Sequence, residues 1–200
     1  AAAGGRRAGG EDLVGTEHDV SAIILAAGVG KRMQSDLAKV LHPVLGRPML
    51  DHVIDAVRGA GVRRVVVVIG HQAERVRTAM AGRCVEFALQ SEQLGTGHAV
   101  RQAEPLLAGT RGTVLVLCGD TPLFRAESLA RLIEEHHRQG NVATFLSAEI
   151  PDPSGYGRVV RRGGQVTAIV EEKDCSPQER LIREIASGVY LRHGSFDNGE

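Results

Sequence analysis

The chain has 200 residues, of which 42% are hydrophobic, and its 24 Lys and Arg side chains balance 24 Asp and Glu side chains. This composition predicts one folded domain with a hydrophobic core and excludes disorder along the whole length. A formal net charge of zero gives no general attraction to nucleic acid or to an anionic membrane. Any anion site must therefore come from a few clustered basic residues.

Hydrophobic segments in the chain are short. The longest aliphatic runs, residues 22–27 and 65–69, fall far short of the roughly 18 residues that suggest a membrane span. The N-terminal stretch has no apolar segment that would serve as a secretory signal. The three cysteines, Cys84, Cys118 and Cys175, have no C-x-x-C spacing. We therefore expect a soluble cytoplasmic protein without a disulfide framework or a zinc site.

The predicted elements alternate between strand and helix. Residues 1–19 lack a hydrophobic period and are expected to form a flexible N-terminal extension. From Val20 onward, the alternation predicts βαβ units around a mainly parallel sheet. The expected strands are residues 20–27, 64–69, 84–90, 113–117, 142–149 and 185–192, and the expected helices are residues 48–61, 73–81, 97–107 and 126–138. Gly163 and Gly164 are predicted to join residues 158–162 and 165–171 into a hairpin.

In open α/β sheets, ligands bind beyond the carboxyl ends of the strands. The loops selected by this rule are residues 28–39, 70–72, 90–98 and 119–123. In the first loop, Gly28 and Gly30 let the backbone turn and point N–H groups at an anion, while Lys31 and Arg32 supply positive charge. Met33 replaces the third glycine of a dinucleotide-binding loop. An ordinary glycine turn is the alternative interpretation.

Two further charged residues point to a phosphate site. Arg32 and Lys39 flank one segment and can approach a polyphosphate from two sides, although a solvated basic surface is the commoner fate of such residues. Asp120 ends a buried strand and is the best candidate ligand for Mg²⁺, which takes one or two carboxylates together with phosphate oxygens. Capping of the following turn at Thr121 is the alternative role for Asp120.

The loop after the third strand carries amide side chains. Gln90 and Gln93 offer donors and acceptors that can read a nucleobase edge, and Thr96 lies before a helix. A simple loop with Thr96 near the N-cap is the alternative. His98 is interpreted as structural.

Taken in order, the motifs resemble the uridyltransferase domain of the bacterial bifunctional N-acetylglucosamine-1-phosphate uridyltransferase / glucosamine-1-phosphate acetyltransferase family. They extend from about residue 21 to residue 193 and read LAAGVGKRM with SDLAKVLHPVLGRPM, QSEQLGTGHA, LCGDTPL, DPSGYGR with AIVEEKD, and EIASGVY.

The resemblance implies a Rossmann-like nucleotidyltransferase fold, with a mainly parallel mixed sheet flanked by helices and a β-hairpin subregion near the C-terminus. It implies condensation of UTP with N-acetylglucosamine 1-phosphate, with Mg²⁺ as cofactor, to give pyrophosphate and UDP-N-acetylglucosamine for cell-wall synthesis. It implies no nucleic acid or membrane partner. Residues 20–200 would form this domain without its last part, because the family continues to a second metal ligand and to a β-helix that supports a trimer.

The resemblance also assigns roles to individual positions. Arg32 and Lys39 correspond to catalytic residues that bind the triphosphate and stabilise charge in the transition state, and Asp120 corresponds to a metal ligand. The nucleotide-binding residues expected from the resemblance and from the glycine loop are Leu25, Ala26, Ala27, Gly28, Gly30, Gln90, Gly95 and Thr96. The sugar-contacting positions are Gly157, Glu171 and Ala186.

Three positions depart from the family pattern: Lys31 stands in place of Thr, Ala38 in place of Pro, and Ala186 in place of Asn. Two alternatives therefore stay open. One is a sugar-1-phosphate nucleotidyltransferase that uses another nucleotide or sugar, although QLGTGHA favours uridine. The other is a non-catalytic nucleotide-binding module, to which the loss of the Asn amide at Ala186 points.

Overall fold

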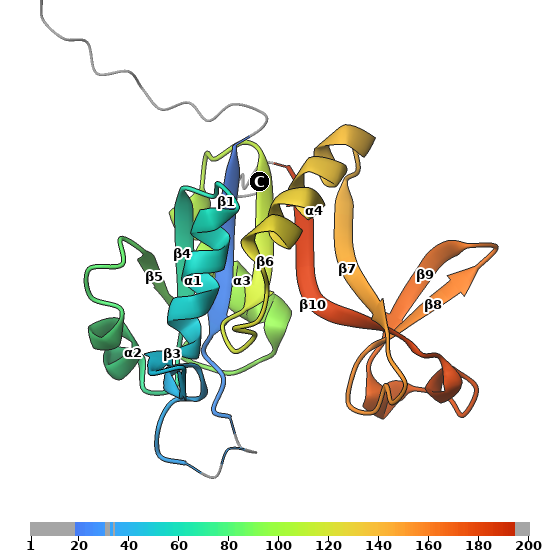
Figure 1. The fold of residues 1–200 in the computed structure, drawn as a ribbon, viewed down its shortest axis with the longest axis horizontal. Coiled ribbons are helices and arrows are strands. Elements are labelled where there is room, and N and C mark those ends of the chain that lie inside the picture. Colours follow the sequence, from blue (N-terminus) through green and yellow to red (C-terminus); the bar gives the residue numbers. More distant parts are fainter. Residues whose placement is uncertain (1–18, 31–32, 34, 195–200) are drawn as a thin grey trace, which may run out of the picture.

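The computed structural model describes residues 19–30, 33 and 35–194. Most of the predicted extension, residues 1–18, and the predicted catalytic Arg32 lie outside these described residues. Within them, the strands form an eight-stranded sheet in the order β5-β4-β1-β6-β10-β8-β9, with β7 paired to β10 (Figure 1).

The first half of the sheet is parallel. Its strands are β1 (Val20–Ala26), β4 (Arg64–Ile69), β5 (Glu86–Leu89) and β6 (Thr113–Cys118). β1 lies between β4 and β6, with Ile24 level with Val67 on one side and Leu117 on the other. Strands buried on both faces read as continuous aliphatic runs, which is why β1, β4 and β6 could be recognised in the sequence.

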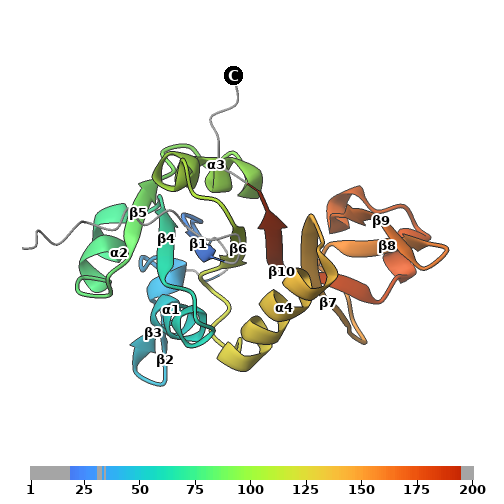
Figure 2. The same ribbon diagram turned by 90° about the horizontal axis from the view of Figure 1, so that it is seen from above.

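Helices cover both faces of this parallel half. They are α1 (Met49–Gly59), α2 (Ala73–Ala79), α3 (Thr96–Leu107) and α4 (Ala126–Gln139). Figure 2 shows α3 on one side of the strands and α1 with α4 on the other. Because side chains alternate along a strand, Ile24 packs in the core cluster of Leu50 on α1, whereas Ile23 packs in that of Ala103 on α3.

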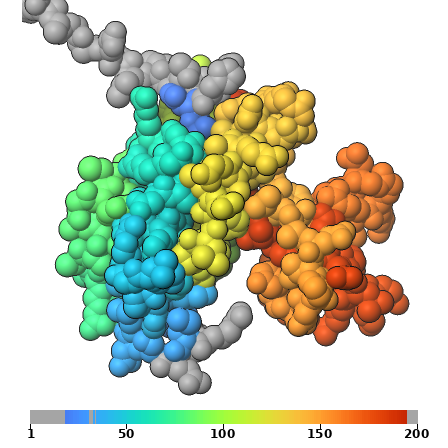
Figure 3. All heavy atoms as spheres, in the orientation of Figure 1, coloured from blue at the N-terminus to red at the C-terminus, as the bar shows by residue number. Residues whose placement is uncertain are grey.

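The second half of the sheet is antiparallel. It contains β7 (Ala143–Glu149), β8 (Arg158–Arg162), β9 (Gln165–Val170) and β10 (Glu184–His193). β10 pairs with β6 near its end and with β8 near its start, so it connects the two halves. We call residues 150–186, which include β8, β9 and the start of β10, the distal region. Figure 3 shows a deep indentation between this region and the body below α4.

The predicted fold class is confirmed, and the predicted strands and helices are present with small changes at their ends. β5 begins at Glu86 instead of Cys84, because Cys84 has a φ of 51°, which a strand does not accommodate. The sequence analysis missed the short hairpin of β2 (Pro43–Val44) and β3 (Arg47–Pro48). It also missed the 3₁₀ helices at Lys39–Leu41, Glu172–Asp174 and Glu179–Leu181.

None of the helices in the described part of the chain has the length and apolar character of a membrane-spanning segment.

Candidate functional site

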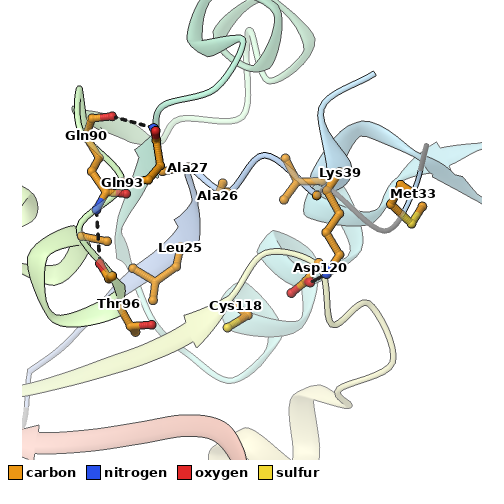
Figure 4. A pocket seen from close by; sticks show the side chains of 15 residues that line it. Leu25, Ala26, Ala27, Met33, Lys39, Gln90, Gln93, Thr96, Cys118 and Asp120 are labelled. Atoms are coloured by element: carbon orange, nitrogen blue, oxygen red, sulfur yellow. Dashed lines mark hydrogen bonds and ion pairs between the residues drawn. The ribbon is translucent and has the colours of Figure 1, made fainter. Parts of the chain in front are cut away.

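A pocket of about 760 Å³ opens at the carboxyl edge of the parallel strands. Its walls come from the segments that follow β1, β5 and β6, which are three of the four loops selected from the sequence. Every residue predicted to bind nucleotide lines it, namely Leu25, Ala26, Ala27, Gly28, Gly30, Gln90, Gly95 and Thr96. Lys39 and Asp120 line the same pocket, so the sequence-predicted residues from distant segments meet there (Figure 4).

The glycine loop after β1 leaves room for Lys39. Gly30 has a φ of 65°, and a Cβ atom built there would lie 2.7 Å from Cβ of Lys39. Real Cβ atoms do not approach this closely, so a side chain at residue 30 would displace the lysine. Gly28 has open space around its Cα. The loop therefore requires glycine at residue 30 for two reasons, backbone conformation and proximity to Lys39.

Gln90 is held at the opposite wall of the pocket. Gln90 is only 3% exposed, and its Nε2 donates to the carbonyl of Gly95 at 3.2 Å. His98 lies between the amides of Gln90 and Gln102, with nitrogen separations of 3.0 and 3.1 Å. His98 thus supports Gln90, in agreement with its structural interpretation. Thr96 begins α3, whose N-terminal N–H groups favour negative charge.

Lys39 and Asp120 form an ion pair inside the pocket, and their side chains are 40% and 24% exposed. Lys39 begins a 3₁₀ helix, and Asp120 follows β6. The turn after β6 is capped by Thr121, whose hydroxyl donates to the carbonyl of Cys118 at 2.7 Å. Because Thr121 fills that role, the carboxylate of Asp120 is available to face the pocket, opposite Gln90, Gln93 and Thr96 (Figure 4).

The donor set suits a cation only together with a phosphate ligand. No cluster of three or more His, Cys, Asp or Glu side chains that could hold a metal occurs within residues 19–30, 33 and 35–194. The single carboxylate of Asp120 is a hard oxygen donor, and Mg²⁺-type ions commonly take one or two carboxylates with phosphate oxygens. Asp120 therefore fits a divalent cation that arrives with a polyphosphate.

Cys118 is a pocket residue that the sequence analysis interpreted as a buried or incidental thiol. It lines the pocket beside Asp120. Burial, and next the negative charge of Asp120, raise the pKa of the Cys118 thiol, while Lys39 opposes this effect. The thiol is therefore protonated at neutral pH and adds a neutral surface. Its position in the sequence, two residues before Asp120, could have indicated that Cys118 lines the pocket. The pocket is also lined by Gln93, a possible base reader, and by three residues without a predicted role, Met33, Val40 and Ala99.

The three predicted sugar-contacting residues lie together, but not in this pocket. The backbone N–H of Ala186 donates to the carbonyl of Gly157 at 2.9 Å. Oε1 of Glu171 lies 3.6 Å from the position that a Cβ of Gly157 would occupy. None of the three is among the described residues that line the pocket. Burial, and next the charges of Glu171 and Cys118, raise the pKa of Tyr190 on β10.

An ion pair that the sequence analysis missed holds the distal region. Arg158 is 2% exposed, and its Nη2 lies 2.5 Å from Oε2 of Glu172. The same carboxylate oxygen accepts from the backbone N–H of Gly155 at 3.2 Å, and Nη1 of Arg158 donates to the carbonyl of Tyr156. The hydrogen bond from Arg158 and, next in size, that from the backbone of Gly155 lower the pKa of Glu172. The pair thus fixes the backbone just before Gly157.

Comparisons with known proteins identify a matching domain family and similar chains. Residues 22–182 match the model of the MobA-like NTP transferase domain. The chain is 56% identical over 180 residues to the protein named Bifunctional protein GlmU from Pelobacter propionicus, which covers 89% of this chain and 39% of that protein. It is 57% identical over 182 residues to the protein of the same name from Pelotomaculum thermopropionicum, with coverage of 90% and 40%. The chain thus spans about two fifths of the length of these relatives.

A solved structure from Bacillus anthracis, described as a glucose-1-phosphate thymidylyltransferase in complex with sucrose, shares the fold. Its TM-score is 0.75 at 21% sequence identity, over 87% of this chain and 71% of that chain. At this identity the similarity shows a common fold.

Proposed function

We propose, from the premise that the chain belongs to the MobA-like NTP transferase domain family, that it transfers a uridylyl group from UTP to N-acetylglucosamine 1-phosphate. The products would be UDP-N-acetylglucosamine and pyrophosphate. The named relatives support this choice of substrates. The observation that carries the proposal is that Lys39 and Asp120 share one pocket with Gln90, Gly95 and Thr96. Action in the cytoplasm is part of the same proposal, because a nucleoside triphosphate is the substrate.

The proposed reaction needs no protein base. A phosphate oxygen of the sugar phosphate is already anionic, and it forms the new bond to the α-phosphorus of UTP. The bond from that phosphorus to the oxygen bridging to the β-phosphate breaks, and pyrophosphate leaves with the electron pair. Two anions must meet in line, so the protein has to hold them in position and offset their repulsion.

We assign positioning and charge to separate parts of the pocket. The amide of Gln90 with Gly95 and Thr96 would hold the base, and the glycine loop from Leu25 to Gly30 would approach the ribose and phosphates. The ammonium of Lys39 would stabilise charge on the α-phosphate and on departing pyrophosphate. Arg32, which lies outside the described residues, is assigned to the same task on the resemblance alone.

A divalent cation, for which we propose Mg²⁺, would be held by the carboxylate of Asp120 and would supply charge neutralisation on the phosphates. In the present structure that carboxylate is paired with Lys39. Binding of nucleotide would therefore require Lys39 to turn from Asp120 toward a phosphate, which leaves Asp120 able to coordinate a cation.

The distal region is proposed to bind the sugar through Gly157, Glu171 and Ala186. These residues lie outside the pocket lining, as expected for a second substrate that meets the nucleotide at its phosphates. Ala186 lacks the amide expected from the family pattern, so the acceptor sugar is tested separately below. We further propose that residues 20–200 belong to one nucleotidyltransferase domain.

The test measures pyrophosphate release with UTP, N-acetylglucosamine 1-phosphate and Mg²⁺. Lys39→Ala and Asp120→Ala should each lower kcat at least 100-fold, equivalent to about 3 kcal/mol of transition-state stabilisation. Arg131→Ala removes an exposed basic side chain on α4 that does not line the pocket, and serves as the control, with a rate close to wild type.

The same assay run with dTTP, CTP and GTP, and with glucose 1-phosphate, tests the choice of substrates. Faster turnover of another pair would replace the proposed substrates. Calorimetry that detects UTP binding while every pair fails to release pyrophosphate would reject the catalytic proposal in favour of a nucleotide-binding module.

A further inference from the structure

The loop of residues 70–72 is the fourth loop selected from the sequence, and within the described chain it contributes no residue to the pocket wall. It nevertheless lies directly behind that wall. The backbone N–H of His71 donates to the carbonyl of Ala27 at 3.2 Å. A Cβ built on Gly70 would lie 2.8 Å from the carbonyl oxygen of Gln90 and 2.9 Å from Cβ of Ala27. The loop is thus packed against both the β1 end and the base-binding segment.

Gln72 extends this connection to the segment that carries Lys39. Its Oε1 accepts from the backbone N–H of Ala38 at 3.2 Å, and its Nε2 donates to the carbonyl of Asp36. Ala38 immediately precedes Lys39 and is only 1% exposed. One side-chain amide therefore holds two backbone groups of the chain that leads into the lysine.

We propose that Gln72 is a positioning residue for the transfer reaction, whose amide sets the place from which the ammonium of Lys39 reaches the phosphates. This inference rests on the proposed function. Lys39 needs such support because its long side chain is 40% exposed and flexible. A lysine anchored at its backbone delivers charge to one point, whereas a lysine on a mobile segment spreads that charge over many positions.

The backbone conformation of Gln72 supports a specific role for its side chain. Gln72 has a φ of 53° and precedes α2. Glycine adopts this left-handed conformation with less strain than any other residue. Glutamine would thus be a poor choice if only the turn were required, and the feature that glycine lacks is the amide that binds Asp36 and Ala38.

Arg75 provides a matched control. Its Nη1 lies 3.3 Å from the carbonyl oxygen of Asp36 and 3.2 Å from Oε1 of Gln72, on the exposed side of the same contacts. Arg75 touches the carbonyl that Gln72 holds, but no hydrogen bond from it reaches Ala38 among the described residues. Arg75→Ala should therefore leave turnover within about twofold of wild type.

The decisive variant is Gln72→Gly, which removes the amide and suits the left-handed backbone. We expect kcat to fall about tenfold while KM for UTP changes by less than about threefold, because only the geometry of the lysine in the transition state is lost. Melting temperature should stay the same or rise. Gln72→Glu, which places a carboxylate against the carbonyl of Asp36, should lower kcat as well. Wild-type kcat in both variants would overturn the proposal.

A double variant separates positioning from general damage. If Gln72 acts through Lys39, then Lys39→Ala/Gln72→Gly should be no slower than Lys39→Ala alone. A second tenfold loss in the double variant would mean that Gln72 serves something other than Lys39.

Hydrogen exchange gives a readout that does not need the reaction. The amide proton of Ala38 should exchange at least about tenfold faster in Gln72→Gly than in wild type, and the amide of Gln90 should be unchanged. If wild-type protein releases no pyrophosphate, the proposed function fails, while this measurement still tests the contact. Unchanged protection of Ala38 would overturn the positioning role.

Discussion

The two halves of the sheet hold their candidate functional residues by different means. In the parallel half, strand ends and glycine turns place the pocket by backbone contacts, such as Gly119 N–H to the carbonyl of Leu25 at 2.9 Å. In the distal region, charged side chains hold the backbone, as in the pairs Arg158–Glu172 and Arg161–Glu184. The end of the sheet that carries the pocket is therefore built on a hydrophobic core, whereas the distal region relies on ion pairs.

Burial explains this difference. Every residue of β4 from Val65 to Ile69 is at most 2% exposed, whereas Val166 and Ile169 on β9 are 38% and 36% exposed. A thin antiparallel hairpin buries too little apolar surface to hold itself by packing alone. We therefore expect loss of a single charge to lower the stability of the distal region more than that of the pocket. We expect added volume to have the opposite order of effects.

The largest effect is expected from Arg158→Met, which keeps an unbranched side chain and removes the charge and hydrogen bonds of the guanidinium. The free energy of unfolding should fall by about 2 kcal/mol, since Glu172 is left without its partner but can still reach water. KM for the sugar phosphate should rise more than KM for UTP. Urea denaturation and steady-state kinetics measure the two effects.

Arg138→Met is the matched control, because Arg138 pairs with Glu135 at 2.6 Å but has a side chain that is 66% exposed. It should change stability by less than about 0.5 kcal/mol. Equal stability losses in the two variants would remove the distinction between a structural pair and a surface pair.

An intermediate effect is expected from Gly30→Ala. The alanine must adopt a φ of 65°, and its Cβ would lie 2.7 Å from Cβ of Lys39. We therefore expect a loss of about 1.5 kcal/mol in unfolding free energy. Gly28→Ala serves as the comparison, because a Cβ there meets nothing within 4 Å. Thermal denaturation of both proteins decides the point, and a Gly30→Ala protein as stable as Gly28→Ala would argue against close packing of the loop on Lys39.

The smallest effect concerns pH and the distal pair Arg161–Glu184. The hydrogen bond from Arg161 lowers the pKa of Glu184 from 4.5 to about 2, burial acts against this, and a bond from Ser147 adds to it. A carboxyl with a lowered pKa in the folded state contributes stability above pH 4.5, and that contribution is lost as pH falls toward 2. The contribution should be about 1 kcal/mol, as for a partly exposed pair.

Unfolding measured between pH 6 and pH 3 should therefore show a smaller loss of stability in Glu184→Gln than in wild type. Glu92→Gln, at an exposed loop position, provides the reference. A pH profile of Glu184→Gln that overlays the wild-type profile would show that the pair adds nothing to the distal region.

Much of the pocket could be predicted because its residues sit at the ends of recognisable strands. The buried runs that became β1, β5 and β6 end at Leu25 to Gly28, at Gln90 and at Asp120, and parallel strands bring such ends to one edge. The contacts of Gln72 with Asp36 and Ala38 could not be predicted, since an amide in a turn gives no local sign of the backbone it will bind. The pair Arg158–Glu172 was missed for a similar reason, because charged residues usually indicate solvated surface.

The amino-acid sequence by itself determined the order of strands and helices and the loops at which chemistry is expected, because hydrophobic period and turn residues report the local burial of each segment. The family followed from the resemblance of the ordered motifs. Only the tertiary structure decided that Lys39 pairs with Asp120, that Gln72 holds the segment before Lys39, and that the residues predicted to contact the sugar lie outside the pocket. Those contacts join segments far apart in the chain, and their geometry depends on how the sheet is assembled.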